Sequence, residues 1–179
     1  SEPQPRTTGF VDLTTMGWPD LEVGPDGLRI GATCPIATLV EWAQGRETRR
    51  TAELAPAPSD WTALALAPLA ADALLASSKI WVTATVGGNV CRTYAAAAMI
   101  SLAVALDGVA HCWAADGSER RLPVAELPTG DTTNTLAPGE ILRAVEIPAS
   151  ALRSRAVLHR ISLAELGRSG SVVTGRVDA

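Results

Sequence analysis

The stretch Ile80 to Asn89, which reads IWVTATVGGN, decides how this chain is interpreted. Between Ile80 and Val86 apolar residues alternate with tryptophan and threonine, and a period of two is typical of a β-strand. The strand is expected to end at Gly87-Gly88-Asn89, because paired glycines allow a tight turn. From Thr93 to Leu106 the chain is alanine-rich and apolar, which predicts a buried helix. The sequence thus predicts a strand, a glycine turn and a helix in succession.

Upstream of this stretch, turn residues and hydrophobic spacing predict a hairpin and two helices. Asp26-Gly27 suits the positive backbone angles of a tight hairpin turn. Thr33 or Cys34 is expected to cap the first helix, whose apolar residues recur at helical spacing. The expected elements are a short strand at Phe10 to Leu13, a hairpin of Leu21 to Val23 with Leu28 to Ala32, a helix from Pro35 to Ala43, and a helix from Trp61 to Ala76 with a kink at Pro68.

Downstream, short segments between turn residues predict a meander of strands. These strands are expected at Val109 to Ala114, Arg120 to Leu122 and Glu140 to Ile147. The tail predicts two more, at Val157 to Ile161 and Ser171 to Val177, with sheet partners beyond Ala179. Together the elements predict an α+β fold, a mainly antiparallel sheet flanked by helices.

Composition excludes several classes of function. The 179 residues carry a net charge of −4, and the arginines are scattered, so nucleic acid is a poor candidate partner. No apolar run reaches the roughly 20 residues that span a bilayer. Three widely spaced cysteines and two histidines indicate neither a disulfide framework nor a metal site. Since the chain also opens without an export signal, a reducing, cytoplasmic setting is expected.

The glycine turn is the strongest chemical signal in the sequence. Glycines let a ligand approach the backbone, exposed N–H groups at a turn bind oxygen atoms, and Thr85 and Asn89 add side-chain hydrogen bonds. The simpler interpretation is a tight turn with Asn89 as a helix cap. His111 and His159 have no neighbours that suggest a metal site or a triad, and each is expected on a strand surface. The five tryptophans are expected in the core or at subunit interfaces.

Several motifs in one order resemble the flavoprotein subunits of molybdenum hydroxylases, the xanthine and carbon monoxide dehydrogenase family. The resemblance runs from about Val11 to Arg160. Its motifs are Ile30-Gly31-Ala32-Thr33, Ala84 to Cys91, Leu106-Asp107, Pro123 to Gly130, Pro138 to Leu142 and Glu146-Ile147-Pro148.

The resemblance implies an FAD-binding domain and an oxidoreductase complex. Electrons would pass from molybdopterin in a large subunit, through iron-sulfur clusters in a small one, to FAD and then to NAD or oxygen. This chain would be the second subdomain of a two-subdomain FAD-binding fold, with residues 1–150 in that subdomain and residues 151–179 starting a small C-terminal one. The residues that the resemblance places at FAD are Ala84, Thr85, Gly87, Gly88, Asn89, Leu142 near the isoalloxazine, and Arg160 where the family often has lysine.

The chain departs from the family pattern at two places. Ala98 stands where family members carry an aspartate that meets ribose or ribityl hydroxyls. In addition, the family's A-G-G-T-like pyrophosphate loop would precede Ser1, so the chain is expected to be truncated at both ends. Near the turn, Tyr94 is expected either to stack on the flavin or to cap a helix, and Arg92 either to pair with a phosphate or to be exposed.

Two other functions remain open. The departures favour a scaffold module that keeps the fold and subunit contacts but binds no FAD, whereas the intact turn from Thr85 to Asn89 favours binding. The other open function is that of a flavin domain of the wider oxidase superfamily that works without molybdenum. The substrate is not readable, because another subunit would select it.

Overall fold

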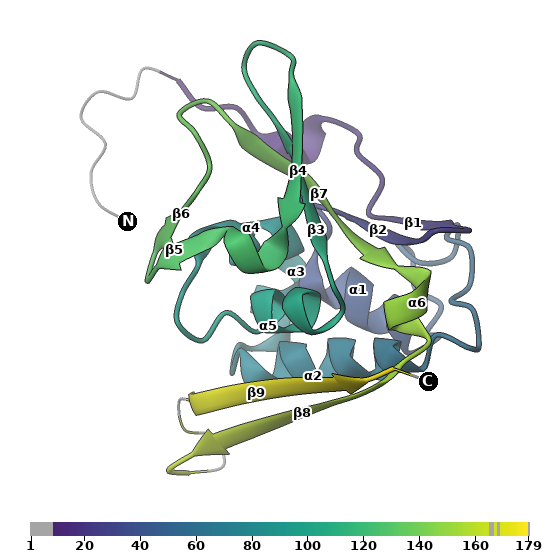
Figure 1. The fold of residues 1–179 in the computed structure, drawn as a ribbon. Coiled ribbons are helices and arrows are strands. Elements are labelled where there is room, and N and C mark those ends of the chain that lie inside the picture. The colour runs from purple at the N-terminus through teal and green to yellow at the C-terminus, as the bar shows by residue number, and fades with distance from the viewer. Residues whose placement is uncertain (1–8, 165–166, 168, 179) are drawn as a thin grey trace.

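A five-stranded antiparallel sheet organises the fold (Figure 1). The computed structural model describes residues 9–164, 167 and 169–178. In the order β1-β2-β7-β3-β4, the strands are Leu21–Gly24, Gly27–Gly31, Ile141–Pro148, Val109–Trp113 and Glu119–Pro123. The predicted hairpin and meander are confirmed, and β7 joins them by pairing with β2 on one side and β3 on the other. The prediction of an α+β fold with a mainly antiparallel sheet is also confirmed.

Helices cover one face of this sheet (Figure 1). The α-helices are α1 (Ile36–Ala43), α2 (Leu66–Ala73), α3 (Ser78–Thr83), α4 (Val86–Arg92), α5 (Ala98–Ala105) and α6 (Ala149–Leu152); the 3-10 helices are η1 (Leu13–Thr15), η2 (Thr62–Ala65) and η3 (Val124–Glu126). Buried side chains of the sheet, such as Leu28 and Val145, form one core with those of the helices, such as Leu39, Leu66 and Met99. No helix in the described parts of the chain is both long and apolar enough to cross a membrane.

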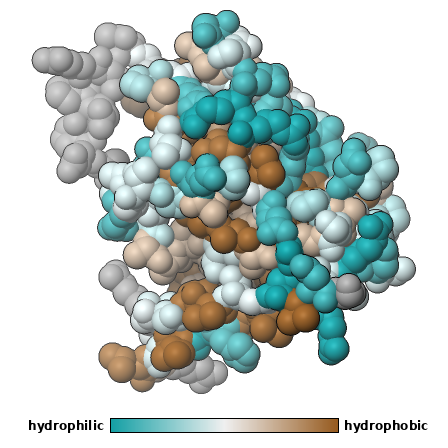
Figure 2. Space-filling model, viewed as in Figure 1, coloured by the Kyte–Doolittle hydropathy of each residue, from teal (hydrophilic) through white to brown (hydrophobic). Residues whose placement is uncertain are grey.

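The tail forms a separate hairpin below the helices in Figure 1, which makes three layers. Strands β8 (Arg155–Ser162) and β9 (Ser169–Val177) pair with each other, and the expectation of further partners beyond Ala179 stays a prediction. The hairpin packs on α2, α5 and η2. Its outward face is hydrophobic, as the brown atoms low in Figure 2 show. The exposed residues there include Val157, Ile161, Val173 and Val177.

The predicted strand from Ile80 to Val86 is wrong. Ser78–Thr83 is α3, and beyond it only Thr85 makes a β-bridge, with Pro35. The alternation misled because α3 is a short, surface helix in which Ile80 is 49% and Val82 61% exposed. A helix that leaves apolar residues in water lacks the spacing that marks a buried face.

Two predicted helices begin differently in the structure. The helix expected from Thr93 begins at Ala98. Thr93 cannot begin it, because this residue has a left-handed φ of 44° and ends α4. The first helix is capped by Pro35, without a side-chain hydrogen bond, and not by Thr33 or Cys34.

Two further expectations need correction. The segment from Trp61 is a 3-10 helix that becomes α2 at Leu66, so the irregularity lies just before Pro68. The strand expected at Phe10 to Leu13 is absent from the described residues. The chain instead forms η1, capped by the carboxylate of Asp12, and Phe10 is 94% exposed.

A short two-stranded ribbon, β5 (Pro128–Gly130) with β6 (Thr133–Asn134), leads back towards β7. The loop after it is fastened by Glu140, whose side chain is only 4% exposed. Arg120 donates to both Glu140 carboxylate oxygens, at 2.9 and 2.7 Å, and the N–H of Ala137 adds a third bond at 2.9 Å.

These bonds make a prediction for acid stability. Hydrogen bonds from Arg120 hold the pKa of Glu140 below its usual value of 4.5, despite the opposing effect of burial. A lowered folded-state pKa stabilises the protein above the unfolded pKa, and this contribution is lost as the pH falls through the folded value. Glu140→Gln is therefore expected to cost about 1–2 kcal/mol at neutral pH, and less in acid. Urea unfolding at pH 7 and at lower pH values measures this; an equal cost at every pH would contradict it.

Candidate functional site

The turn at Ala84 to Asn89 is built as a capped helix start. Thr85 is the N-cap of α4, and its hydroxyl oxygen accepts the Gly88 N–H at 3.0 Å. The N–H of Asn89 donates to the carbonyl of Thr85 at 3.0 Å. Threonine is a favoured cap because its side-chain oxygen satisfies an N–H that has no partner within the helix. The cap of α4 is therefore Thr85, whereas the side-chain oxygen of Asn89 accepts the Met99 N–H in the first turn of α5.

Hydrogen bonds to the end of β2 and the loop after it fix the turn in space. The N–H of Val86 donates to the Cys34 carbonyl at 2.9 Å, and that of Gly87 to the Ala32 carbonyl at 3.0 Å. On the other side, the N–H of Ile36 donates to the Ala84 carbonyl at 2.9 Å. All four N–H groups of the first turn of α4 are thus engaged within the protein. The expectation that these groups are free for ligand oxygen atoms is wrong.

The two glycines have different roles. Gly87 is buried, and a Cβ added there would lie 2.5 Å from the Cβ and 2.6 Å from the Cα of Ala32. Real side chains do not tolerate such contacts, so Gly87 allows α4 to pack closely against the chain after β2. Gly88 is exposed, and its added Cβ would approach only the Thr85 hydroxyl, at 2.9 Å. Gly88 is the glycine that leaves the backbone open to a ligand.

Side chains supply the donors that remain at the turn. The Thr85 oxygen accepts from Gly88, which leaves its O–H available to donate. Asn89 uses its amide oxygen to accept the Met99 N–H at 3.2 Å, and its NH₂ group has no acceptor within the described residues. These donors and the bare backbone of Gly88 suit a ligand rich in oxygen atoms, such as the phosphate and hydroxyl groups of FAD.

The other two predicted site residues lie apart from the turn in different ways. Leu142 is 3% exposed on β7, with its side chain in the core, and α4 packs on that strand. Arg160 lies on β8 and donates to the Gly167 carbonyl at 3.1 Å. Figure 1 places the β8–β9 hairpin across the helical layer from β7. The structure thus gathers Ala84 to Asn89, sets Leu142 in the core near α4, and holds Arg160 in another layer.

After the turn, Arg92 and Tyr94 interact with each other. The guanidinium lies 5.0 Å from the centre of the Tyr94 ring and donates to its hydroxyl. Both residues are exposed, and Tyr94 does not cap α5, whose N-cap is Ala97. Ala98, at the family's aspartate position, is fully buried at the start of α5.

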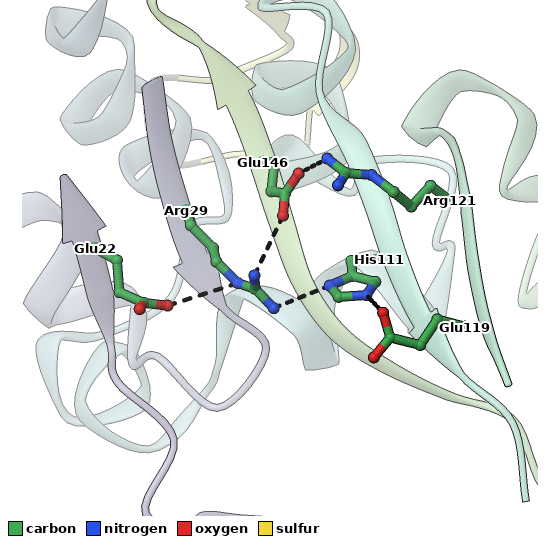
Figure 3. Close-up of polar contacts among 6 residues, drawn as sticks. All are labelled: Glu22, Arg29, His111, Glu119, Arg121 and Glu146. Carbon is green, nitrogen blue, oxygen red and sulfur yellow. Dashed lines mark hydrogen bonds and ion pairs between the residues drawn. The ribbon is translucent and has the colours of Figure 1, made fainter. Parts of the chain in front are cut away.

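A second polar cluster crosses the sheet face opposite the helices (Figure 3). Glu146 on β7 pairs with Arg121 on β4 and, at 3.4 Å, with Arg29 on β2. Arg29 also lies 3.6 Å from Glu22 on β1. A cavity of about 590 Å³ borders this cluster. Because the charges in Figure 3 pair with one another, the cluster joins strands and is less suited than the turn to bind a charged ligand.

His111 belongs to this cluster and is 6% exposed, so the expectation of a strand surface residue is wrong for it. Its Nδ1 lies 2.9 Å from the Arg29 guanidinium, and its Nε2 lies 2.8 Å from the Glu119 carboxylate. Arginine can only donate, so Nδ1 of His111 accepts the hydrogen bond from Arg29. Nε2 therefore carries the ring hydrogen and donates the hydrogen bond that Glu119 accepts. His159 is exposed on β8, as predicted.

The cysteines contribute no nucleophile. All three are free thiols, and burial raises the pKa of Cys91 to about 11, with a smaller effect from nearby Cys112. Burial also raises the pKa values of Cys34 and Cys112. Thiolates are the reactive form, so these side chains act as core residues. Within the described ranges, no three histidine, cysteine or acidic side chains form a group that could hold a metal ion.

One polar residue beside the site was missed by sequence analysis. Asp131, in the turn between β5 and β6, accepts the Ala95 N–H at 3.1 Å and so holds the loop between α4 and α5. It lies 36 residues from Ala95 in the chain, and no motif signals the contact. The carbonyls of Ala32 and Cys34 were missed for the same reason, because backbone groups leave no trace in residue type.

Solved structures with a similar fold include carbon monoxide dehydrogenases and a quinoline oxidoreductase. A chain of the Cu,Mo-CO dehydrogenase aligns with a TM-score of 0.67 and 17% identity, over 86% of this chain and 48% of that one. The CO dehydrogenase of Oligotropha carboxidovorans gives 0.66 and 18%, over 85% and 47%. Quinoline 2-oxidoreductase from Pseudomonas putida 86 gives 0.61 and 18%, over 83% and 46%. This chain therefore spans about half the length of these relatives. A comparison with curated proteins gave no match.

At such identities the structural likeness shows the fold alone, and the family rests on the sequence. Residues 3–150 match the family model described as the FAD binding domain in molybdopterin dehydrogenase. That range contains the capped turn, α4 and the whole five-stranded sheet. The chain belongs to the family of FAD-binding domains of molybdopterin dehydrogenases.

Proposed function

We propose that this chain binds FAD as part of the flavoprotein subunit of a molybdenum hydroxylase, an oxidoreductase. The observation that carries the proposal is the capped turn of α4, placed within a range that matches an FAD-binding family. The turn is held from both sides by backbone hydrogen bonds, so it is formed before any ligand arrives. A preformed site loses little conformational entropy on binding.

The residues proposed to hold FAD are the predicted ones, and the roles proposed for them rest on their hydrogen bonds and exposure. Thr85 and Asn89 would donate to FAD oxygen atoms through the O–H and NH₂ groups that have no acceptor in the described chain. Gly88 would allow close approach, while Ala84 and Gly87 would position the turn. Leu142, beneath α4, and Arg160 remain predicted contacts. When bound, FAD would supply the redox chemistry, and the protein would orient it.

We also propose the division into two units and the place in a complex. The family match ends at Ser150. This end supports a first unit of residues 1–150 and a second unit that begins at residue 151. Proposed partners are a molybdopterin-binding large subunit and an iron-sulfur small subunit, with NAD or oxygen as the electron acceptor. The molybdenum enzymes among the similar structures support these partners. Free thiols support a cytoplasmic location.

A scaffold that binds no FAD is the second candidate. Its support is Ala98, which offers no carboxylate and is fully buried, and the engaged N–H groups of α4. Such a module would keep only the contacts that the fold makes with other subunits. The two candidates differ in one measurable property, the presence of flavin.

The test is the visible absorption spectrum of the protein purified with the subunits that accompany it. We expect the bands of oxidised flavin in the wild type and their loss in Gly88→Val, because the new side chain covers the open backbone. Gly175→Val is the matched control, since a Cβ at Gly175 on β9 meets no atom within 4 Å. A colourless, folded wild type that takes up no added FAD would leave the scaffold function in its place.

A further inference from the structure

Arg143, the third residue of β7, lies on the sheet face opposite the helices and is only 7% exposed. Its guanidinium carbon lies 4.4 Å from the centre of the Trp18 ring and 5.4 Å from that of the Trp113 ring. Trp113 also meets His111, with ring centres 6.4 Å apart, and His111 belongs to the cluster in Figure 3. Arg143 is therefore on the far side of the sheet from the capped turn of α4.

The guanidinium of Arg143 carries N–H groups that no acceptor satisfies. Nε and Nη1 are buried, and neither has a hydrogen-bond partner within the described residues. The indole N–H of Trp113, the ring that Arg143 contacts, is a third buried donor of this kind. Buried donors without an acceptor destabilise a protein, most of all when they are charged, so each of them calls for an explanation. A place rich in donors and poor in acceptors suits a ligand that presents oxygen atoms.

The positive charge of Arg143 is also unbalanced. Arg29 pairs with Glu22 and Glu146, whereas no carboxylate in the described parts of the chain lies within ion-pair distance of Arg143. Burial lowers the pKa of Arg143, the charge of Arg29 lowers it further, and Glu22 opposes both effects. One added negative charge would balance the guanidinium, whereas a doubly charged anion beside Glu22 would exceed the balance. A carboxylate has that single charge, and its two oxygen atoms match the donors of a guanidinium.

Trp18 forms the outer wall of this place. It belongs to the segment between η1 and β1, and its ring packs edge to face on Trp113, with centres 5.6 Å apart and an angle of 81°. The residues just before it, Thr14 to Gly17, are exposed, and the Trp18 side chain itself is half-buried. A rotation of this side chain uncovers Arg143 and leaves the strands of the sheet in place.

We propose that Arg143 binds a small carboxylate on this face of the sheet, at a site that does not depend on FAD. The carboxylate accepts hydrogen bonds from the guanidinium of Arg143 and from the indole N–H of Trp113. Trp18 rotates to admit the ligand. The indole rings hold the guanidinium in position beforehand, so little side-chain freedom is lost on binding.

The test measures acetate binding to the full chain by tryptophan fluorescence and by thermal unfolding, since two of the five tryptophans form the site. Inorganic phosphate is the second probe, and sodium chloride at equal ionic strength controls for screening of surface charges. Arg143→Met removes the charge and the donors but keeps a long, adaptable side chain between the rings. Arg153→Met is the matched control, because it removes the same charge from an exposed arginine that pairs with Asp60 at 2.6 Å.

We expect acetate, beyond any effect of chloride, to shift the emission of the wild type and to raise its unfolding midpoint by about 3 °C. Arg143→Met should abolish both responses, and Arg153→Met should keep them. Phosphate should bind about tenfold more weakly than acetate, because its second charge meets Glu22. Without acetate, Arg143→Met should unfold no earlier than the wild type, since it removes a buried charge that has no partner.

Three results would overturn the site. The first is a wild type that responds to acetate no more than to chloride, and the second is an acetate response that survives in Arg143→Met. The third is phosphate binding as tight as that of acetate, which removes the carboxylate assignment. If Arg143→Met does not fold, Arg143→Lys takes its place. Lysine keeps the charge without the planar fork, so acetate should bind about tenfold more weakly, and unchanged affinity counts against the site. No measurement involves flavin, so the proposed function stands or falls separately.

Discussion

Replacing Gly87 by alanine is expected to lower the free energy of unfolding by about 3 kcal/mol, at the upper end of what overpacking costs. The added methyl group would meet the backbone of Ala32 at 2.6 Å, so α4 must move away from β2 and loses the Gly87 hydrogen bond to the Ala32 carbonyl. The same change at Gly88 is expected to shift stability by less than about 1 kcal/mol. There the methyl group meets a hydroxyl, and alanine favours the helix.

Urea denaturation of the two variants beside the wild type gives this comparison directly. Equal stability of Gly87→Ala and Gly88→Ala would contradict the assignment of different roles to the two glycines. The result also decides how flavin binding is tested. A variant of Gly87 that loses flavin has lost its packing as well, whereas a variant of Gly88 changes only the exposed side of the turn, where the nearest atom is the Thr85 hydroxyl.

Replacing Leu142 by alanine is expected to cost about 3 kcal/mol, within the range for a large side chain removed from a core. Leu142 is 3% exposed and belongs to the core between the sheet and the helices. The matched control is Leu69→Ala on α2, where leucine is 44% exposed and the expected cost is below about 0.5 kcal/mol. Thermal unfolding followed by circular dichroism compares them.

The Leu142 experiment also bears on the predicted flavin contact. If Leu142→Ala lowers stability by the same amount with and without bound FAD, the role of Leu142 is packing. If FAD stabilises the wild type more than it stabilises Leu142→Ala, Leu142 also contacts the ligand, because a ligand that binds more tightly stabilises the folded state more. A cost close to that of Leu69→Ala without FAD would contradict the core role.

The sheet could be predicted from the sequence because its signals are local. Asp26-Gly27 and Asp116-Gly117 mark two hairpin turns, and the strands β3 and β7 carry apolar residues between turn residues. The strand expected at Ile80 to Val86 failed because seven alternating residues fit a strand or an exposed helical turn equally well. The strand and the helical turn are distinguished by the bridge from Thr85 to Pro35, a contact that no local pattern encodes.

The candidate turn could be located from the sequence, but the contacts that build it could not. Motif order pointed to Ala84 to Asn89, and the structure gathers these residues at one turn. Their division of labour depends on Ala32 and Cys34, which approach from another element. Asp131 was missed because the turn that carries it folds back onto a loop met much earlier in the chain.

The bridge between Pro35 and Thr85 also has a consequence for the order of folding. It joins positions about fifty residues apart, so a long loop must close before the first turn of α4 gains its partners. The β1–β2 hairpin needs no such closure, because its strands are joined by a tight turn. The turn at Ala84 to Asn89 is therefore expected to form late, after the β1–β2 hairpin to which it attaches.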